Sequence, residues 1–168
     1  TDYMPLGEYE ADGYVQPYCD SPLDGEAVAE SAYLNVLQHA RDYVYIVTPY
    51  LIVDNEMVTA LCLAAKSGVD VRILTPGVPD KWYVYYVTQS YYPRLLEAGV
   101  RIYEYTPGFV HAKMYVSDDC EAIVGSANMD YRSLYLHFEN CCAFYGGHMV
   151  RDVLEDVRAT LAESHEVT

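Results

Sequence analysis

Short runs of β-branched and aromatic residues alternate with helical stretches along most of the chain, and this alternation constrains the fold more than any other feature. Residues 43–48, 69–75 and 100–105 are such runs, and proline follows closely after each. The stretches between them repeat apolar residues every three or four positions, as in a helix with one buried face. Strands joined through helices lie parallel, so we predict an α/β fold with a mostly parallel mixed sheet of about six to eight strands and helices on both faces.

Capping and turn residues set the expected boundaries of these elements. Asp54 is a candidate N-cap and Gly68 a C-terminal stop for one helix, whereas Pro93 disfavours helix at Tyr92 and predicts an interruption in another. We predict helices at residues 26–41, 55–67, 80–98 and about 149–162. We predict strands at residues 13–19, 43–48, 69–75, 100–105, 111–117, 121–124 and about 136–145, with a turn at 126–133.

A single domain accounts for the chain. Its 168 residues, 52% of them hydrophobic, suffice for one substantial core but not for two of ordinary size. Residues 1–12 are polar and contain Pro5 and Gly7, so we interpret them as a tail or linker before a domain at residues 13–168. The chain opens at Thr1 without a secretory signal or a long apolar run, so we expect an excised piece of a longer protein.

The formal net charge of −15 excludes one broad class of function. Binding to nucleic acid or to anionic lipid over a wide surface needs positive charge, so no nucleic-acid partner is expected. Any anionic ligand must therefore be captured locally, by a few well-placed groups.

One stretch, residues 110–139, concentrates groups that suit such a ligand. His111 and Lys113 stand two residues apart, and on a strand this spacing puts both side chains on one face. An imidazole for proton transfer or nucleophilic attack would then lie beside a fixed cation. Ser126 and Asn128 add neutral hydrogen-bond donors. The set suits a phosphate diester, whose non-bridging oxygens must be held while one ester bond is exchanged.

The spacing of this stretch resembles the signature of the phospholipase D superfamily, H-x-K-x4-D-x6-G-S-x-N. The six fixed positions are filled by His111, Lys113, Asp118, Gly125, Ser126 and Asn128, and the likeness continues through Asp130, Arg132, Ser133 and Glu139. Further segments, among them Thr48-Pro49-Tyr50 and Ala98-Gly99-Val100, are similar to the C-terminal half of bacterial cardiolipin synthase. The resemblance implies a phospholipase D-like half and extends over nearly all of residues 13–168.

The resemblance implies a role for each group that faces the substrate. His111 either attacks phosphorus, giving a phosphohistidine-type intermediate, or protonates the departing alkoxide. Lys113 holds a non-bridging phosphate oxygen, because an ammonium is a compact point charge. Ser126 and Asn128 donate hydrogen bonds to the same oxygens.

Other motif positions are expected to support these groups. The resemblance places Glu139 as the acceptor for the N–H of His111, which fixes the tautomer of the ring. Asp118 falls beyond the end of the strand, so we expect a structural role, with Arg132 as its candidate partner. Gly125 would let the backbone approach closely.

The chain carries half of the two-motif site that the resemblance implies. His39 lacks a following Gly-Ser-x-Asn, and His148 and His165 have no motif partner. A second H-x-K-x4-D half must come from the parent chain or from a homodimer partner. The implied function is a cardiolipin synthase-like phosphatidyltransferase that joins two phosphatidylglycerols and releases glycerol. It would need no metal and no cofactor. The parent would act at the cytoplasmic face of the cell membrane, and the fragment itself is expected to be soluble and inactive or very weak.

Two other interpretations remain open. The chain would fit a different phosphodiesterase of the superfamily, a nuclease or phospholipase that acts without metal as a homodimer. It would also fit a non-catalytic, lipid-recognising half. Trp82, with Tyr83, Tyr85 and Tyr86, is a candidate contact with a membrane surface.

Overall fold

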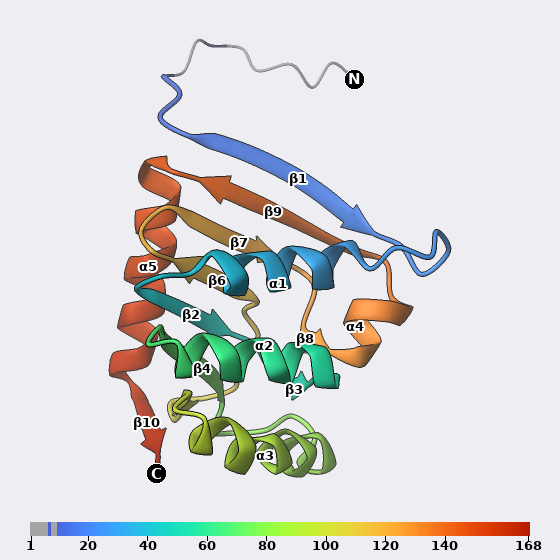
Figure 1. Cartoon of the computed structure of the whole chain (residues 1–168), viewed down its shortest axis with the longest axis vertical. Coiled ribbons are helices and arrows are strands. Elements are labelled where there is room, and N and C mark those ends of the chain that lie inside the picture. Colours follow the sequence, from blue (N-terminus) through green and yellow to red (C-terminus); the bar gives the residue numbers. More distant parts are fainter. Residues whose placement is uncertain (1–6, 8–9) are drawn as a thin grey trace.

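The computed structural model describes residue 7 and residues 10–168 of the chain, so most of the predicted tail lies outside the described residues. A single large sheet forms the centre (Figure 1). Its helices are α1 (Val28–His39), α2 (Asn55–Lys66), α3 (Trp82–Glu97), α4 (Tyr131–Leu136) and α5 (Gly147–Ala162). The strands of the described residues are β1 (Tyr14–Asp20), β2 (Tyr43–Val47), β3 (Leu51–Ile52), β4 (Asp70–Pro76), β5 (Arg101–Tyr105), β6 (Met114–Ser117), β7 (Glu121–Gly125), β8 (Met129–Asp130), β9 (Glu139–Tyr145) and β10 (Ser164–Val167).

The central sheet has eight strands in the order β1-β9-β7-β6-β2-β4-β5-β10, and β3 pairs with β8 separately. This confirms the predicted α/β class, the strand number and the helices on both faces. The expectation of a mostly parallel sheet is wrong. Only β2–β4 and β4–β5 are parallel, and the other five pairings of this sheet are antiparallel. Helices connect the strands of this sheet from β1 to β5, β6 and β7 form a hairpin, and α5 later carries the chain from β9 to β10 across the sheet.

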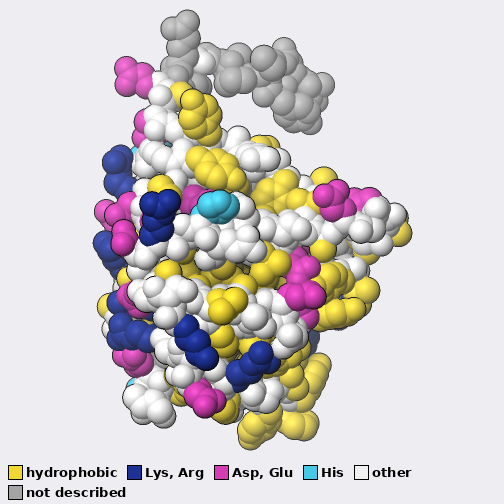
Figure 2. Space-filling model, viewed as in Figure 1, with side chains coloured by type: hydrophobic (Ala, Val, Ile, Leu, Met, Phe, Trp, Pro, Cys, Tyr) yellow, Lys and Arg dark blue, Asp and Glu magenta, His cyan; other side chains and the backbone are white. Residues whose placement is uncertain are grey.

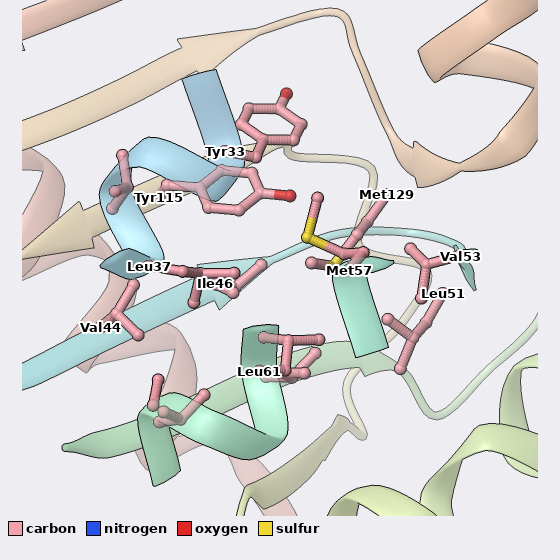
Figure 3. Packing of buried hydrophobic residues seen from close by; sticks show 14 of the residues in the cluster. Tyr33, Leu37, Val44, Ile46, Leu51, Val53, Met57, Leu61, Tyr115 and Met129 are labelled. Atoms are coloured by element: carbon pink, nitrogen blue, oxygen red, sulfur yellow. The ribbon is translucent and has the colours of Figure 1, made fainter. Parts of the chain in front are cut away.

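Two hydrophobic layers hold the helices to the sheet. Figure 1 shows α1, α2 and α3 side by side in front of the strands. In this layer the ring of Tyr33 from α1 stacks on that of Tyr115 from β6 at 3.9 Å, and Met57 and Met129 pack nearby (Figure 3). The opposite face is covered by α5, whose apolar residues form the second layer with β2, β6 and β7. The sheet is therefore buried on both sides at its centre.

Local capping confirms some predicted boundaries, and packing overrides others. The Asp54 side chain accepts the Met57 N–H at 2.9 Å and begins α2, and Gly68 has the positive φ of +98° that ends it. The interruption expected in α3 is absent, because the helix continues through Pro93. Tyr92 is buried, and its hydroxyl contacts Thr75 and Glu104, which anchors this turn to the sheet.

The motif region differs most from its prediction. The strand expected at residues 111–117 begins only at Met114, so His111 and Lys113 precede β6 and lie outside any strand. The strand expected from residue 136 begins at Glu139, because α4 occupies part of the predicted turn and strand. Asp130 accepts the Ser133 N–H at 2.8 Å and caps this helix. The short strands β3, β8 and β10 were not predicted, since two to four residues carry too little periodicity.

Asp118 has the structural role expected of it, but with different partners. Its carboxylate accepts backbone N–H bonds from Arg41 at 2.7 Å, Asp42 at 3.0 Å and Tyr43 at 2.8 Å. These amides lead into β2, so the end of β6 is fixed to the start of its neighbour. Asp118 also has a φ of +51°, which aspartate tolerates better than most residues. Its expected contact with Arg132 is not formed among the described residues.

We predict that Asp118→Ala lowers the free energy of unfolding by about 2 kcal/mol, because three amide donors lose a charged acceptor. Asp118→Asn should lose less, since one amide oxygen still accepts and asparagine also tolerates positive φ. Urea denaturation of both variants beside the wild type measures the difference. A loss below about 0.5 kcal/mol for the alanine variant would contradict this role.

Candidate active site

The side chains of His111 and Lys113 meet at the entrance to β6. The Lys113 Nζ lies 3.1 Å from His111 Nε2 and donates to the His111 carbonyl at 2.7 Å. His111 is exposed, whereas only 8% of Lys113 is exposed. The expected juxtaposition of imidazole and ammonium therefore exists. It is held by these hydrogen bonds and not by strand pairing.

The contact with Lys113 defines the state of the His111 ring. An ammonium can only donate, so Nε2 must accept and carry the lone pair, and the proton of a neutral ring lies on Nδ1. The unprotonated nitrogen therefore faces the place where Lys113 can hold an anion. This is the arrangement that a nucleophilic imidazole needs.

The charge of Lys113 has no counterion in direct contact. Among the described residues, no carboxylate lies within 4.0 Å of its ammonium. Burial lowers the pKa of Lys113, and the more distant charges of Glu139 and Asp130 oppose that change only in part. A buried cation without a contacting anion is costly, so this position favours an anionic ligand.

Glu139 contacts other partners than the one expected. Its Oε2 accepts the Ser126 hydroxyl in a very short hydrogen bond, and its Oε1 lies 3.6 Å from His137 Nδ1. Arg132 donates to the other ring nitrogen of His137 at 2.8 Å, so Arg132 holds His137. Within the described residues Glu139 makes no hydrogen bond to His111. Glu139 is buried and thus fixes the Ser126 hydroxyl beside the motif.

The turn from Gly125 to Asn128 is packed tightly against β9. A Cβ atom at Gly125 would lie 2.3 Å from the Cys141 Sγ and 2.7 Å from the Asn140 carbonyl oxygen. The close approach expected at this glycine is therefore an approach to β9. Ser126 adds two hydrogen bonds with the backbone of Asn140, at 2.9 and 3.0 Å. These contacts hold the turn rigidly next to Lys113.

The Asn128 side chain keeps one polar atom free. Its Nδ2 donates to the Ser133 Oγ at 2.9 Å, while its Oδ1 is buried and has no hydrogen-bond partner. The Ser133 hydroxyl can donate as well as accept, so the amide turned by 180° would leave two N–H donors free instead. A buried amide with unused capacity is typical of a ligand-binding position.

Sequence reasoning missed the supporting roles of Thr48, Asp130 and Ser133. The Thr48 hydroxyl accepts the Met129 N–H at 3.0 Å, which fixes β8, and Asp130 caps α4. Ser133 holds the Asn128 amide. Two sequence features pointed to them: the motif continues through Asp130 and Ser133, and Thr48 lies in the Thr48-Pro49-Tyr50 segment. Neither feature showed which hydrogen bonds these residues make.

Two aromatic rings lie one after the other beside His111, and the second of them borders a cleft with cationic residues. The Phe109 ring lies 5.6 Å from the His111 ring and 6.5 Å from the Tyr50 ring. Tyr50 also lines an adjacent cleft of about 340 Å³ with Lys81, Asp130, Arg132 and other residues. Within the His111–Lys113 pair, the His111 ring is exposed to solvent, whereas Lys113 is buried beneath it.

The aromatic group at the start of α3 is largely exposed. Trp82 is 71% exposed and makes edge contacts with the exposed rings of Tyr83 and Tyr86. Tyr85 differs, because its hydroxyl donates to Glu104. None of the helices in the described residues is long and apolar enough to cross a bilayer.

Solved structures share this fold. The chain is similar to Nuc of Salmonella typhimurium, a phospholipase D family member, with a TM-score of 0.78 and 17% identity over 93% of this chain and 99% of that chain. It is similar to phosphatidylserine synthase from Haemophilus influenzae, with a TM-score of 0.75 and 16% identity over 91% of this chain and 40% of that chain. At this identity the likeness shows the fold alone.

Sequence relatives are much more similar. The chain is 44% identical to a cardiolipin synthase from Geobacillus kaustophilus, over 94% of this chain and 32% of the relative. It is 39% identical to cardiolipin synthase 2 from Bacillus cereus, over 99% of this chain and 33% of the relative. An uncharacterized protein from Streptococcus mutans is 54% identical over 96% of this chain and 35% of the relative. The chain thus spans about a third of the length of these relatives.

The family profile described as "Cardiolipin synthase, PLD-like domain" matches residues 33–160, most of the chain. This range contains the paired His111 and Lys113, the Ser126–Asn128 turn and Glu139. The chain therefore belongs to the cardiolipin synthase PLD-like domain family of the phospholipase D superfamily.

Proposed function

We propose that this chain supplies one catalytic half of a cardiolipin synthase-like phosphatidyltransferase. The observation that carries the proposal is the buried Lys113 ammonium, which contacts the lone-pair nitrogen of His111 and has no carboxylate in contact. A phosphodiester supplies both the anion that Lys113 lacks and the phosphorus atom that His111 would attack. The relatives named cardiolipin synthase support a reaction of this class, and we propose phosphatidylglycerol as the lipid on both sides of the exchange.

The proposed reaction has two steps. His111 Nε2 attacks phosphorus, the P–O bond to the terminal glycerol breaks, and an acid outside this chain protonates the departing alkoxide. The phosphatidyl group then rests on the imidazole. The same group outside this chain then takes the proton from the hydroxyl of a second phosphatidylglycerol, whose oxygen attacks the phosphorus, and the P–N bond breaks to give cardiolipin and free His111. Lys113, with the Asn128 amide, stabilises the charge on the non-bridging oxygens in both steps, while the Ser126 hydroxyl donates to Glu139 and supports the turn.

The reaction requires a second half. This chain supplies one H-x-K-x4-D motif, and its His111 is exposed, so another domain can approach it. The relatives are about three times as long, which supports completion by the parent chain. The completed protein would act at the cytoplasmic face of the membrane, with the exposed aromatic side chains at the start of α3 as one contact.

A homodimeric phosphodiesterase is the second candidate. The structural match to Nuc supports it. This match covers 99% of the Nuc chain, so a chain of about this length can carry the fold alone. A dimer would bring two His111–Lys113 pairs to one site. The net charge of −15 disfavours nucleic acid as its substrate.

We predict that His111→Asn lowers the transferase rate of the complete protein by about 1000-fold or more, because the covalent route is lost. A wild-type sample quenched in neutral denaturant during turnover should contain a peptide with a phosphatidyl group on His111, since an acid quench would cleave a phosphorus–nitrogen bond. The matched control is His148→Asn, because His148 is exposed and pairs with Asp12 at the other end of the sheet. Transfer at the wild-type rate by the His111 variant would contradict the proposal.

We predict that Lys113→Met separates activity from stability. The kcat/KM should fall by about 100-fold or more, because the phosphate loses its cation. The free energy of unfolding at pH 7 should rise by about 1 kcal/mol, because burial lowers the pKa of Lys113 and the folded state therefore carries a cost for the charged form.

The same pKa shift sets the pH dependence of the wild type. As the pH rises from the lowered pKa of Lys113 towards the ordinary value of 10.5, the unfolded chain holds the lysine proton more than the folded chain does. This contribution to stability should therefore grow with pH in the wild type and be missing in Lys113→Met. Thermal unfolding of both proteins from pH 7 to pH 10 measures it. A Lys113→Met variant that is both inactive and less stable than the wild type would contradict the view that Lys113 binds an anion at a cost to stability.

A further inference from the structure

Three carboxylates from two segments, the beginnings of α1 and α2, meet on the helical face of the molecule. Glu30 lies in the first turn of α1, Asp54 caps α2, and Glu56 lies in the first turn of α2. One oxygen of each carboxylate lies within 4.8 Å of the others. Figure 1 shows that the beginnings of α1 and α2 both face α4, and Figure 2 shows acidic side chains gathered in this region. We name these three residues the acidic cluster.

The local structure explains only part of the acidic cluster. The positive end of a helix dipole stabilises acids in the first turn, and Asp54 is further satisfied by the Met57 N–H and by the Tyr135 hydroxyl at 2.5 Å. Glu30 differs from the other two. Its side chain is nine-tenths buried, with 9% exposed, and its Oε1 has no hydrogen-bond partner. A buried carboxylate oxygen without a partner is costly and indicates a missing ligand.

No positive side chain compensates the acidic cluster. The ion pairs of the described residues include none of its members, so no lysine, arginine or histidine lies within 4.0 Å of them. The described residues therefore supply no positive charge to the acidic cluster, and a cation from solution can provide it.

We propose that Glu30, Asp54 and Glu56 bind a calcium ion that joins the beginnings of α1 and α2. Calcium prefers carboxylate oxygens at about 2.3–2.6 Å, so two ligands on opposite sides of the ion lie about 4.6–5.2 Å apart. One oxygen of each carboxylate lies within 4.8 Å of the others, which is close enough for all three to contact one calcium ion. Magnesium keeps several water ligands and is usually bound by only one or two carboxylates, so a cluster of three carboxylates favours calcium. Glu56 is exposed, so water can complete the coordination from its side.

The ion would act on the catalytic side through α4. The Tyr135 hydroxyl of α4 donates to the Asp54 carboxylate in the acidic cluster. In the first turn of the same helix, Ser133 contacts the Asn128 amide. A calcium ion that fixes Asp54 would therefore also fix the helix that positions the Ser126–Asn128 turn. The ion takes no part in the transfer reaction, so the site is independent of the proposed function.

The test is thermal unfolding of the 168-residue chain in calcium chloride and in EDTA, with affinity measured by calorimetry. At a calcium concentration about 100-fold above the dissociation constant, the melting temperature should rise by about 5–10 °C relative to EDTA. Glu30→Gln and Glu56→Gln should each weaken calcium binding by about tenfold or more, because each removes a charged ligand. Glu56 is exposed, so its variant remains informative if the buried Glu30 variant does not fold. Glu155→Gln on α5 makes the same charge change outside the acidic cluster and should keep the full calcium shift.

Three results would overturn the proposal. One is a wild-type melting temperature that does not respond to millimolar calcium. Another is an equal calcium shift in the wild type and in both cluster variants, which would place binding elsewhere. The third is a larger shift with magnesium chloride than with calcium chloride. If Glu30→Gln is more stable than the wild type in EDTA and calcium has no effect on either, a proton held between carboxyl groups explains the acidic cluster instead.

Discussion

The antiparallel pairing of β6 with β2 is the constraint on which the rest of the molecule depends. It joins the parallel half of the sheet to the antiparallel half, and its register places Met114 opposite Val47 and Ser117 opposite Val44. Asp118 secures this register by accepting three amides at the start of β2. A slip of one residue would exchange the two faces of β6 and turn Lys113 away from the motif turn. Strand register therefore sets where Lys113 enters the site, and the hydrogen bonds from Lys113 to His111 then hold the pair.

The active-site turn is held from the opposite side by the hydrophobic core. The Tyr33 ring stacks on Tyr115, and its hydroxyl donates to the Ala127 carbonyl at 2.8 Å, inside the turn between Ser126 and Asn128. One side chain from α1 thus links the most buried part of the core to the phosphate-binding turn. Because β9 packs against the other side of this turn, the turn needs little rearrangement when a ligand arrives, which favours stabilisation of a transition state by the Asn128 amide.

The regular elements were predictable from the sequence where burial and capping act locally. The β2, β4 and β5 strands and the α2 helix follow from short-range patterns, and the pair of His111 and Lys113 follows from spacing. What failed depends on contacts between distant residues. The strand directions after β5, the short α4 helix and the partners of Glu139 and Asp118 are decided by which segments meet, and no window of sequence contains that information. The continuous α3 helix shows the same effect, since the buried Tyr92 outweighs the preference of its proline neighbour.

The packing of Gly125 changes what the shared signature means. A side chain at this position would occupy the space of the Cys141 sulfur atom, so the glycine is required by the neighbouring strand. Asp118, likewise, serves the backbone of another strand. Two of the six signature positions, Gly125 and Asp118, therefore stabilise the fold, while His111 and Lys113 serve the proposed reaction. A homologue that retained only the glycine and the aspartate would keep this fold after losing its enzymatic activity. Comparison of the glycine–aspartate pair with the histidine–lysine pair therefore distinguishes an inherited fold from retained catalysis.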